Sequence, residues 1–243
     1  MRLNGLFVLS SSYSNTLLLL LVSFCHCTMS ASSLTRIATY RLSARTSLCI
    51  AQGSVVDFSW DNNPKNAAIV NAANEACLGG GGVDGAITSA GGPNLAKDRM
   101  ALPIRMGVRC FTGDAKLTGP GDYGTIQVPY VIHAVGPNYN DCSSLKEGDN
   151  LLQSAYQASL QRAQEAKLEA VAFALLSAGM YRGTQSIHNV LRIAVTSIQE
   201  WAQQQKDDDI SLTHVFLCGF NSNEVNLLVD ICNDLNLKWG DEL

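Results

Sequence analysis

Residues 66–92 read NAAIVNAANEACLGGGGVDGAITSAGG and hold the side chains of this chain best suited to chemistry. An apolar, β-compatible run ends at Asn71 and Asn74, and a run of glycines then leads to Val83 and Asp84. Glycines let backbone N–H groups approach an anion without a Cβ in the way, and a helix start adds free N–H donors and partial positive charge. A strand, a glycine loop without side chains and a helix start, in this order, therefore predict a pocket for a pyrophosphate or a nucleotide. The glycines concerned are Gly79, Gly80, Gly81 and Gly82.

This glycine run differs from the common phosphate-binding motifs. No Lys-Ser or Lys-Thr pair follows it, as a P-loop requires, and the glycines are contiguous rather than spaced as GxGxxG. A flexible surface loop is the competing interpretation. It does not account for two asparagines and an aspartate in a strand-to-helix context.

Two further strand ends carry residues suited to a ligand, and open α/β sheets bind ligands beyond the carboxyl ends of their strands. Small residues follow the strand expected at 170–176, and Phe220 follows the strand expected at 213–218, where its ring could stack on a base. Two backbone cradles and an aromatic platform suit a diphosphate nucleotide better than a single phosphate. The residues after the first of these strands are Ser177, Ala178, Gly179, Met180 and Tyr181.

The remaining pattern alternates strands with helices, which indicates an α/β sandwich with a largely parallel central sheet. The expected strands are residues 35–42, 47–56, 67–70, 108–111, 128–135, 170–176 and 213–218. The expected helices are residues 83–90, 94–102, 150–166, 187–201 and 225–235. A Gly/Pro loop is expected at 118–124, and no second domain is indicated.

Composition narrows the function classes. The chain has 243 residues, 47% of them hydrophobic, and a net charge of −4, so it can bury one α/β domain. No Lys/Arg cluster is present, which argues against nucleic acid as a partner. The eight cysteines form no CxxC pair, so neither a zinc site nor a redox motif is indicated.

The first part of the chain differs from the rest. Residues 1–34 are expected to be a leader or signal-like segment outside the fold, with the domain at 35–243 and no membrane segment in the mature protein. The apolar run at 16–25 suits a signal peptide, and the C-terminal Asp-Glu-Leu resembles an ER-retrieval tail. Alternatively Met29 is the true start and the protein is cytoplasmic or nuclear, which the scattered cysteines favour over the ER lumen.

Four runs in this order resemble the macrodomain family: IVNAANEACLGGGGVDGAI, TGDAKLTG, YVIHAVGPNY and LLSAGMYRG. The resemblance covers roughly residues 37–235 and is greatest to the MacroD-type branch, which hydrolyses ADP-ribose attachments. It implies a three-layer α/β/α sandwich with a mixed central sheet. It also implies that ADP-ribose is the ligand, with its diphosphate held by residues 79–83 and 177–181.

By the same resemblance Asn71, Asn74 and Asp84 surround the distal ribose. Asp84 would orient or activate a water, and Asn74 would hold a ribose hydroxyl. No metal and no cofactor are required. The alternatives are structural: an aspartate in the first helical turn favours the macrodipole, and Asn74 can end a strand with an Asx turn.

The sequence departs from the family pattern at several positions. Ser54 replaces an aspartate that contacts the adenine amino group in many members, and Asp57, three residues on, either substitutes for it or only solvates a loop. Thr88 stands where histidine is common, and Arg182 either covers the pocket mouth or lies in solvent. His133 lies inside an apolar strand, where a hydrogen-bonded core histidine is the commoner outcome than a general base.

Three functions are compatible with these residues. The first is a monomeric hydrolase that removes mono-ADP-ribose from acidic side chains or deacetylates O-acetyl-ADP-ribose. The second is a non-catalytic reader of ADP-ribosylated proteins, and the third a phosphatase for ADP-ribose 1″-phosphate. The pair Asn74 and Asp84 favours the hydrolase, since readers often lack it.

Overall fold

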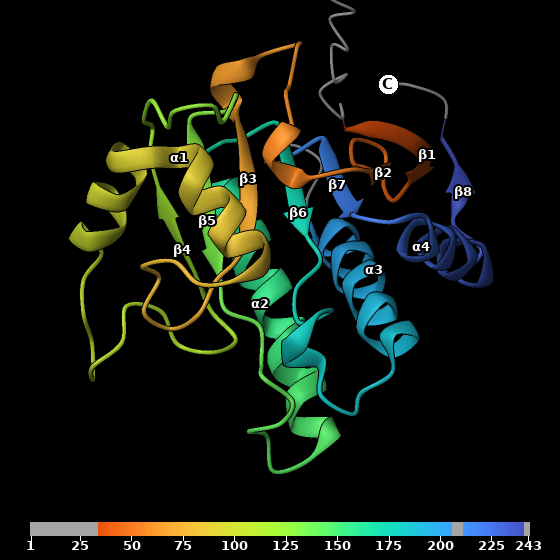
Figure 1. Cartoon of the computed structure of the whole chain (residues 1–243). Coiled ribbons are helices and arrows are strands. Elements are labelled where there is room, and N and C mark those ends of the chain that lie inside the picture. The colour runs from red at the N-terminus through yellow and green to blue at the C-terminus, as the bar shows by residue number, and fades with distance from the viewer. Residues whose placement is uncertain (1–33, 206–210, 241–243) are drawn as a thin grey trace, which may run out of the picture. The chain divides into compact units, whose positions relative to one another are not determined.

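The computed structural model describes residues 34–205 and 211–240, which form a mixed eight-stranded sheet and four α-helices (Figure 1). The strands are β1 (Thr35–Arg41), β2 (Ser47–Gln52), β3 (Ala67–Ala72), β4 (Ala115–Thr118), β5 (Tyr130–Ala134), β6 (Ala170–Ala174), β7 (His214–Gly219) and β8 (Lys238–Trp239). The helices are α1 (Gly82–Ala101), α2 (Leu145–Glu165), α3 (Ile187–Gln204) and α4 (Ser222–Asp234), with short 3₁₀ turns η1 (Val55–Asp57), η2 (Pro64–Asn66) and η3 (Met180–Arg182).

The predicted leader and the C-terminal Asp-Glu-Leu lie outside the described residues, apart from Leu34. Among the residues that are described, no helix is both long and apolar enough to span a bilayer.

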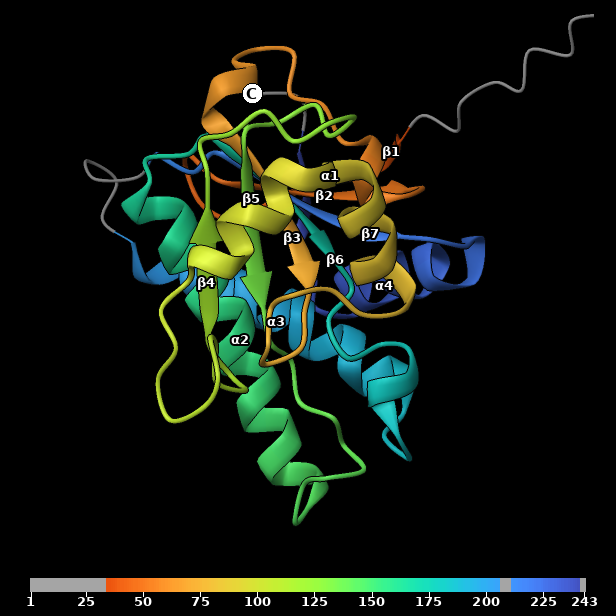
Figure 2. The same ribbon diagram turned by 60° about the vertical axis from the view of Figure 1, so that its left-hand side comes forward.

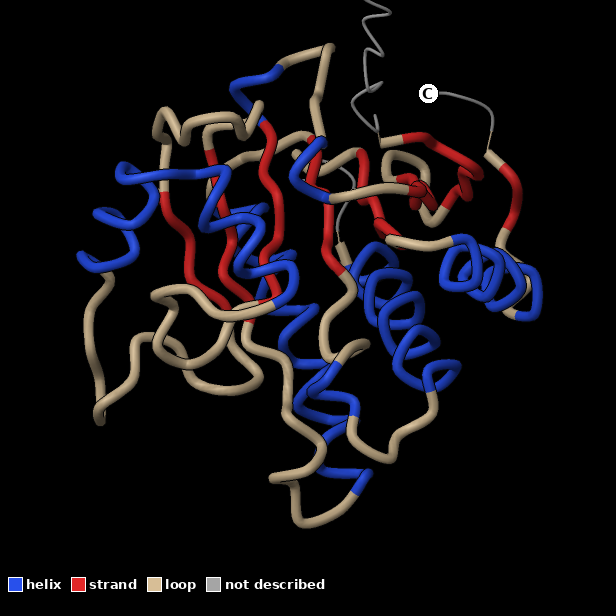
Figure 3. The backbone as a smooth tube through the Cα atoms, in the orientation of Figure 1, coloured by secondary structure: helices blue, strands red, loops and turns tan. Residues whose placement is uncertain are grey.

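The strands follow the order β4-β5-β3-β6-β7-β2-β1-β8 across the sheet, as labelled in Figure 1; Figure 3 draws the strands in red in the same orientation. The five central strands, from β5 to β2, are parallel to one another, while β4, β1 and β8 pair antiparallel at the two sides. The carboxyl ends of β3, β6 and β7 therefore meet at one edge of the sheet. This is the edge at which the sequence places its asparagines, its small residues and Phe220.

Alternation along the strands divides the core between the two faces of the sheet. On β6, Val171 and Phe173 pack against α2, α3 and α4, whereas Ala170, Ala172 and Ala174 face α1. Figures 1 and 2 show α1 on one side of the sheet and α2 and α3 on the other. The predicted three-layer α/β/α sandwich with a mixed sheet is confirmed.

Helix α1 contains the two predicted helical segments as one element with a kink. Gly92 inside it has φ 60° and ψ −157°, and Pro93 follows. A proline ring clashes with the preceding turn of a regular helix. The left-handed region of φ is open to glycine at little cost. The kink turns the second half of α1 so that Leu95 and Arg99 become buried.

The structure differs from the expected strands in three ways: one is absent, two were not predicted and one is shorter. Residues 108–111 are not a strand; apart from one isolated bridge between Arg105 and Val108 they are loop, and the apolar Cys110 packs in a small cluster away from the sheet. The edge strands β4 and β8 were not predicted. The second predicted strand, residues 47–56, ends at Gln52 and is followed by η1.

Candidate functional site

A cleft lies where the carboxyl ends of the central strands meet the amino end of α1. It consists of two cavities, the Phe220 cavity of about 430 Å³ and the Asp84 cavity of about 390 Å³. Both volumes are in the range of small-molecule sites. The two cavities adjoin, because they share the lining residues Gly82, Val83, Leu175, Ala178 and Gly179.

The amino end of α1 differs from those of the other described α-helices. Ser144, Ser186 and Asn221 cap α2, α3 and α4 with side-chain hydrogen bonds, whereas Gly81 at the start of α1 makes none. The first N–H groups of an α-helix have no partner inside the helix. Because Gly81 and Gly82 line the cleft, these donors are available to an anion there.

The glycine run is required by space and by backbone conformation. Gly79 has φ +111° and Gly82 has φ +59°, both in the left-handed region. A Cβ on Gly80 would lie 3.1 Å from Asp84 Oδ2 and 3.2 Å from Asn74 Nδ2. Gly80 therefore lies directly over both side chains. A Cβ on Gly81, in contrast, would meet nothing within 4 Å, because it points into open space.

The second loop, residues 177–181, faces the glycine run across the cleft. The Ser177 hydroxyl donates to Pro137 O at 2.7 Å, so this side chain fixes the loop. A Cβ on Gly136 would lie 2.4 Å from Ser177 Oγ, which explains the glycine at that position. Met180 is almost fully exposed and Tyr181 half exposed at the cleft mouth. Arg182 donates to Gln185 O in its own turn and is not among the lining residues.

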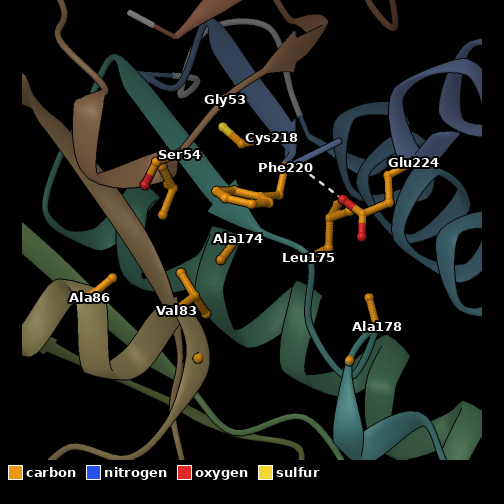
Figure 4. A pocket seen from close by; sticks show the side chains of 13 residues that line it. Gly53, Ser54, Val83, Ala86, Ala174, Leu175, Ala178, Cys218, Phe220 and Glu224 are labelled. Carbon is orange, nitrogen blue, oxygen red and sulfur yellow. Dashed lines mark hydrogen bonds between the residues drawn. The ribbon is translucent and has the colours of Figure 1, made fainter. Parts of the chain in front are cut away.

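Figure 4 shows the Phe220 cavity, with Phe220 lying across it between Ser54 and Leu175. Its floor is formed by the small side chains Ala174 and Cys218, which leave room on the α1 face of the sheet. Phe220 is 76% exposed. An exposed aromatic face of this kind suits stacking with a planar group.

Two polar side chains border the same cavity. Ser54 Oγ accepts from Val56 N at 3.3 Å and caps η1. Glu224 Oε2 accepts from Phe220 N at 2.8 Å and so fixes the backbone of the aromatic residue. Asp57 is not among the lining residues, which favours the loop alternative over the substitute for the missing aspartate.

The Asp84 carboxylate belongs to a buried network. Its Oδ1 accepts from Asn71 Nδ2 at 2.8 Å and from Arg99 Nη2 at 3.1 Å. Its Oδ2 is buried beneath Gly80 and has no hydrogen-bond partner among the described residues. Arg99 is 1% exposed and Asp84 3% exposed, so this is a fully desolvated ion pair.

Arg99 also connects Asp84 to the next turn of α1. Its Nη1 donates to Thr88 Oγ1 at 2.7 Å, and Thr88 Oγ1 donates to Asp84 O at 2.7 Å. Burial lowers the pKa of Arg99, and the adjacent Asp84 carboxylate opposes that shift. A guanidinium nevertheless stays protonated in proteins. Position 88 therefore faces Arg99 rather than the cleft.

Asn71 and His133 complete the network behind Asp84. Asn71 is completely buried, and its Nδ2 lies 3.3 Å from His133 Nδ1, while His133 Nε2 lies 3.0 Å from Thr118 Oγ1. Burial, with a contribution from Arg99, lowers the pKa of His133 well below its ordinary 6.5. The ring is therefore neutral, and Nδ1 accepts from the Asn71 amide. The interpretation of His133 as a hydrogen-bonded core histidine is confirmed.

Asn74 makes the Asx turn considered for it and also lies at the cleft. Its Oδ1 accepts from Ala76 N at 3.1 Å in an Asx turn, and its Nδ2 donates to Gly79 O at 3.0 Å. It also lines the Asp84 cavity. One amide hydrogen thus remains for a ligand hydroxyl.

The structure brings most of the predicted site residues together. The Asp84 cavity is lined by Asn74, Gly80, Gly81, Gly82, Val83, Asp84, Ser177, Ala178, Gly179, Met180 and Tyr181, and the other cavity by Phe220. Two predicted residues are placed otherwise. Asn71 lies behind Asp84, and Gly79 is turned toward Thr88, so neither lines the cleft. Arg99 was missed, because its partner is reached only through the kink in α1.

Sequence comparison identifies relatives along most of the described chain. Residues 70–194 match the macro domain family. A macro domain-containing protein of Xanthomonas axonopodis is 37% identical over 171 residues, which cover 70% of this chain and 86% of the relative. O-acetyl-ADP-ribose deacetylase 1 of Pantoea vagans is 39% identical over 186 residues, covering 76% of this chain and 98% of that protein.

Solved structures agree with these relatives. The Oceanobacillus iheyensis macrodomain with ADP has a TM-score of 0.70 at 27% identity, covering 84% of this chain and 98% of its own. The Trypanosoma brucei macrodomain in complex with ADP-ribose has a TM-score of 0.60 at 29% identity, covering 75% of this chain and 68% of its own. The residues of this cleft, the sheet order and the sequence relatives lead to one conclusion: the chain belongs to the macro domain family.

Proposed function

We propose that this protein is a hydrolase that binds ADP-ribose in the cleft. Its substrates would be mono-ADP-ribose attached to acidic side chains of proteins, O-acetyl-ADP-ribose, or both. Support comes from the cleft itself, from the similarity to a deacetylase of O-acetyl-ADP-ribose, and from related macrodomains solved with ADP and ADP-ribose.

The division of the cleft suits the parts of ADP-ribose. The Phe220 cavity offers an exposed ring and small apolar walls to the adenine. The shared residues Gly82 and Gly179 lie between the cavities, where the uncapped start of α1 can donate to the diphosphate. The Asp84 cavity then takes the distal ribose.

A single observation carries the hydrolase proposal: Asp84 has one engaged and one free carboxylate oxygen. Oδ1 is held by Asn71 and Arg99, and Oδ2 has no partner, although Asp84 lines the cavity. A buried acceptor without a partner is costly, by about 1–3 kcal/mol. A water or a ribose hydroxyl that donates to Oδ2 would remove this cost and would itself be fixed in place.

The reaction proposed for this site is ester hydrolysis. Water adds to the acyl carbon, the bond from that carbon to the ribose oxygen breaks, and the ribose oxygen leaves with a proton. The products are ADP-ribose and a carboxylic acid. Asp84 Oδ2 would orient the attacking water, Asn74 would hold a ribose hydroxyl, and the carboxylate would keep its place because Arg99 and Asn71 hold Oδ1.

Two other functions use the same cleft. A reader of ADP-ribosylated proteins needs the binding residues but no oriented water, and a phosphatase for ADP-ribose 1″-phosphate needs attack at phosphorus. The unpartnered Oδ2 beside Asn74 favours the hydrolase over the reader.

The proposal is tested by binding and by turnover. Calorimetry should show that ADP-ribose binds at least about tenfold more tightly than AMP, since AMP cannot fill both cavities. Product formation should then be followed with a mono-ADP-ribosylated protein, O-acetyl-ADP-ribose and ADP-ribose 1″-phosphate in parallel. Tight binding without any product would identify a reader, and equal affinities for ADP-ribose and AMP would contradict the two-cavity assignment.

A further inference from the structure

A third cavity, of about 380 Å³, lies beside the edge strand β4 and shares no residue with the cleft. We call it the basic cavity. It is formed by the loop between α1 and β4, seen at the lower left of Figure 1, by β4 itself and by the last turns of α2. Its lining residues are Pro103, Arg105, Arg109, Phe111, Asp114, Lys116 and Arg162.

The charge of this cavity is opposite to that of the whole chain. Four of its seven lining residues are cationic and one is acidic, in a chain whose net charge is −4. Lys116 pairs with Asp114 at 2.7 Å, and Arg162 pairs with Glu165 at 3.2 Å. Within the described residues Arg105 and Arg109 have no carboxylate at ion-pair distance. The cavity therefore keeps an excess of positive charge.

The pKa of Asp114, the single acidic lining residue, is affected by the same positive charge. Burial acts to raise the pKa of Asp114, yet hydrogen bonds from Lys116 Nζ and Ala115 N, together with the charge of Arg162, hold it below its ordinary value. Asp114 is thus committed to Lys116 and does not neutralise the arginines.

Two of the arginines have hydrogen-bond donors without acceptors. Arg109 Nε and Arg162 Nε are both buried, and neither has a partner among the described residues. Arg109 Nη1 makes one long contact, 3.4 Å to Ala76 O. Buried donors are nearly always paired in folded proteins. Two such donors, on side chains that line one cationic cavity, point to an acceptor that enters it.

We propose that the basic cavity is a second anion-binding site, which accepts a phosphate group. The guanidinium fork matches the oxygens of phosphate and makes charge-assisted hydrogen bonds that are stronger than neutral ones. Arg109 supplies a donor from the loop and Arg162 supplies one from α2, while the exposed Arg105 adds charge. The proposal is independent of the function proposed for the cleft.

The test is a titration of the full chain with inorganic phosphate and pyrophosphate at low ionic strength, with chloride at matched ionic strength as the comparison. NMR signals of the arginine Nε–H groups report the site directly. We expect the signals of Arg109 and Arg162 to shift on addition of phosphate and not of chloride. Unmoved arginine signals at saturating phosphate would overturn the proposal, whatever the cleft binds.

Two double variants distinguish a specific phosphate site from a general effect of positive charge on the protein. Arg109→Gln with Arg162→Gln should weaken phosphate binding by at least about tenfold, since two charge-assisted bonds are lost. Lys65→Gln with Lys146→Gln removes the same charge from exposed positions outside the cavity and should leave the affinity unchanged. Equal losses in both double variants would refute the site.

A single exposed substitution keeps the test valid if the double variant fails to fold. Arg105→Glu alters only the rim, because Arg105 is exposed. It should weaken phosphate binding measurably, and a thermal melt should show the wild-type transition. Unchanged binding in this variant would contradict the proposed anion site.

Discussion

Replacing Arg99 with methionine should be among the most damaging single changes in this protein. Methionine has a similar length but no charge, so Asp84 would keep only the Asn71 amide on its Oδ1. Arg99 and Asp84 are 1% and 3% exposed, so water cannot replace the lost partner. Removing one member of a buried ion pair costs about 3–5 kcal/mol, against a total stability of roughly 5–15 kcal/mol for a folded domain.

The assays are urea unfolding, which gives the change in free energy, and thermal unfolding, both followed by the fluorescence of the buried Trp60 and Trp201. At about 2–4 °C per kcal/mol for a domain of this size, the melting temperature should fall by roughly 6–20 °C. Lys97→Met is the matched control, because Lys97 is exposed on the same helix. It should change stability by less than about 0.5 kcal/mol.

A double-mutant cycle decides whether the loss comes from the pair. Asp84→Asn alone leaves the Arg99 charge buried without a counter-ion and should cost about as much as Arg99→Met. The two changes together leave no buried charge, so their joint cost should be well below the sum. Additive costs, or a loss below about 1 kcal/mol for Arg99→Met, would show that the pair behaves like an exposed one and would refute the reasoning.

Three further predictions concern the cleft and the core. Gly81→Glu should abolish ADP-ribose binding in calorimetry, because it places a carboxylate at the helix start proposed to hold the diphosphate. The fold should be kept, since the new side chain enters open space. Ser89→Glu on the outer side of α1 should bind normally, and retained binding in Gly81→Glu would place the ligand elsewhere. Asp84→Ala should lower turnover per folded molecule by about 10²-fold or more. Asn74→Ala should also reduce turnover. Unchanged rates in Asp84→Ala would leave Asp84 a structural residue only. The free energy of unfolding should fall as the pH drops below the ordinary histidine pKa of 6.5, by up to about 1.4 kcal/mol per pH unit. The reason is that the unfolded chain binds a proton that buried His133 does not. Urea unfolding of wild type and His133→Gln at pH 7.5 and 5.5 should show this contribution only in the wild type.

The parts of the fold that the sequence predicted are those with continuous or periodic apolar signals. Strands β3, β6 and β7 were found from short apolar runs, and helices α2, α3 and α4 from apolar residues at helical spacing. Edge strands β4 and β8 have four and two residues, too few for a period to be recognised. Residues 108–111 look like a strand because they are apolar, but Cys110 packs against Cys77, Ala73 and Val135 rather than in the sheet.

The site was predicted to the extent that it depends on backbone order. A strand end, a glycine run and a helix start are local features, so Asn74, Gly80 and Asp84 were found. The direction of a side chain at a strand end is set by its neighbours. Asn71 follows Ala67 and Ile69 onto the α1 face and lies beneath Asp84, so it holds Asp84 rather than contacting the cavity. Arg99 is reached only through the kink at Gly92, and no helical spacing predicts that contact.

The ion pair of Asp84 and Arg99 also bears on how an acidic chain could hold the anionic ligand proposed for this cleft. The residues lining its two cavities include Asp84 and Glu224 but no lysine or arginine. Glu224 is committed to the backbone of Phe220, and the charge of Asp84 is balanced from behind by Arg99 at 3.1 Å. What remains at the centre of the cleft is the uncapped start of α1. Under the proposed function, the diphosphate would therefore be held by oriented backbone dipoles, and Arg99 would reduce its repulsion by Asp84.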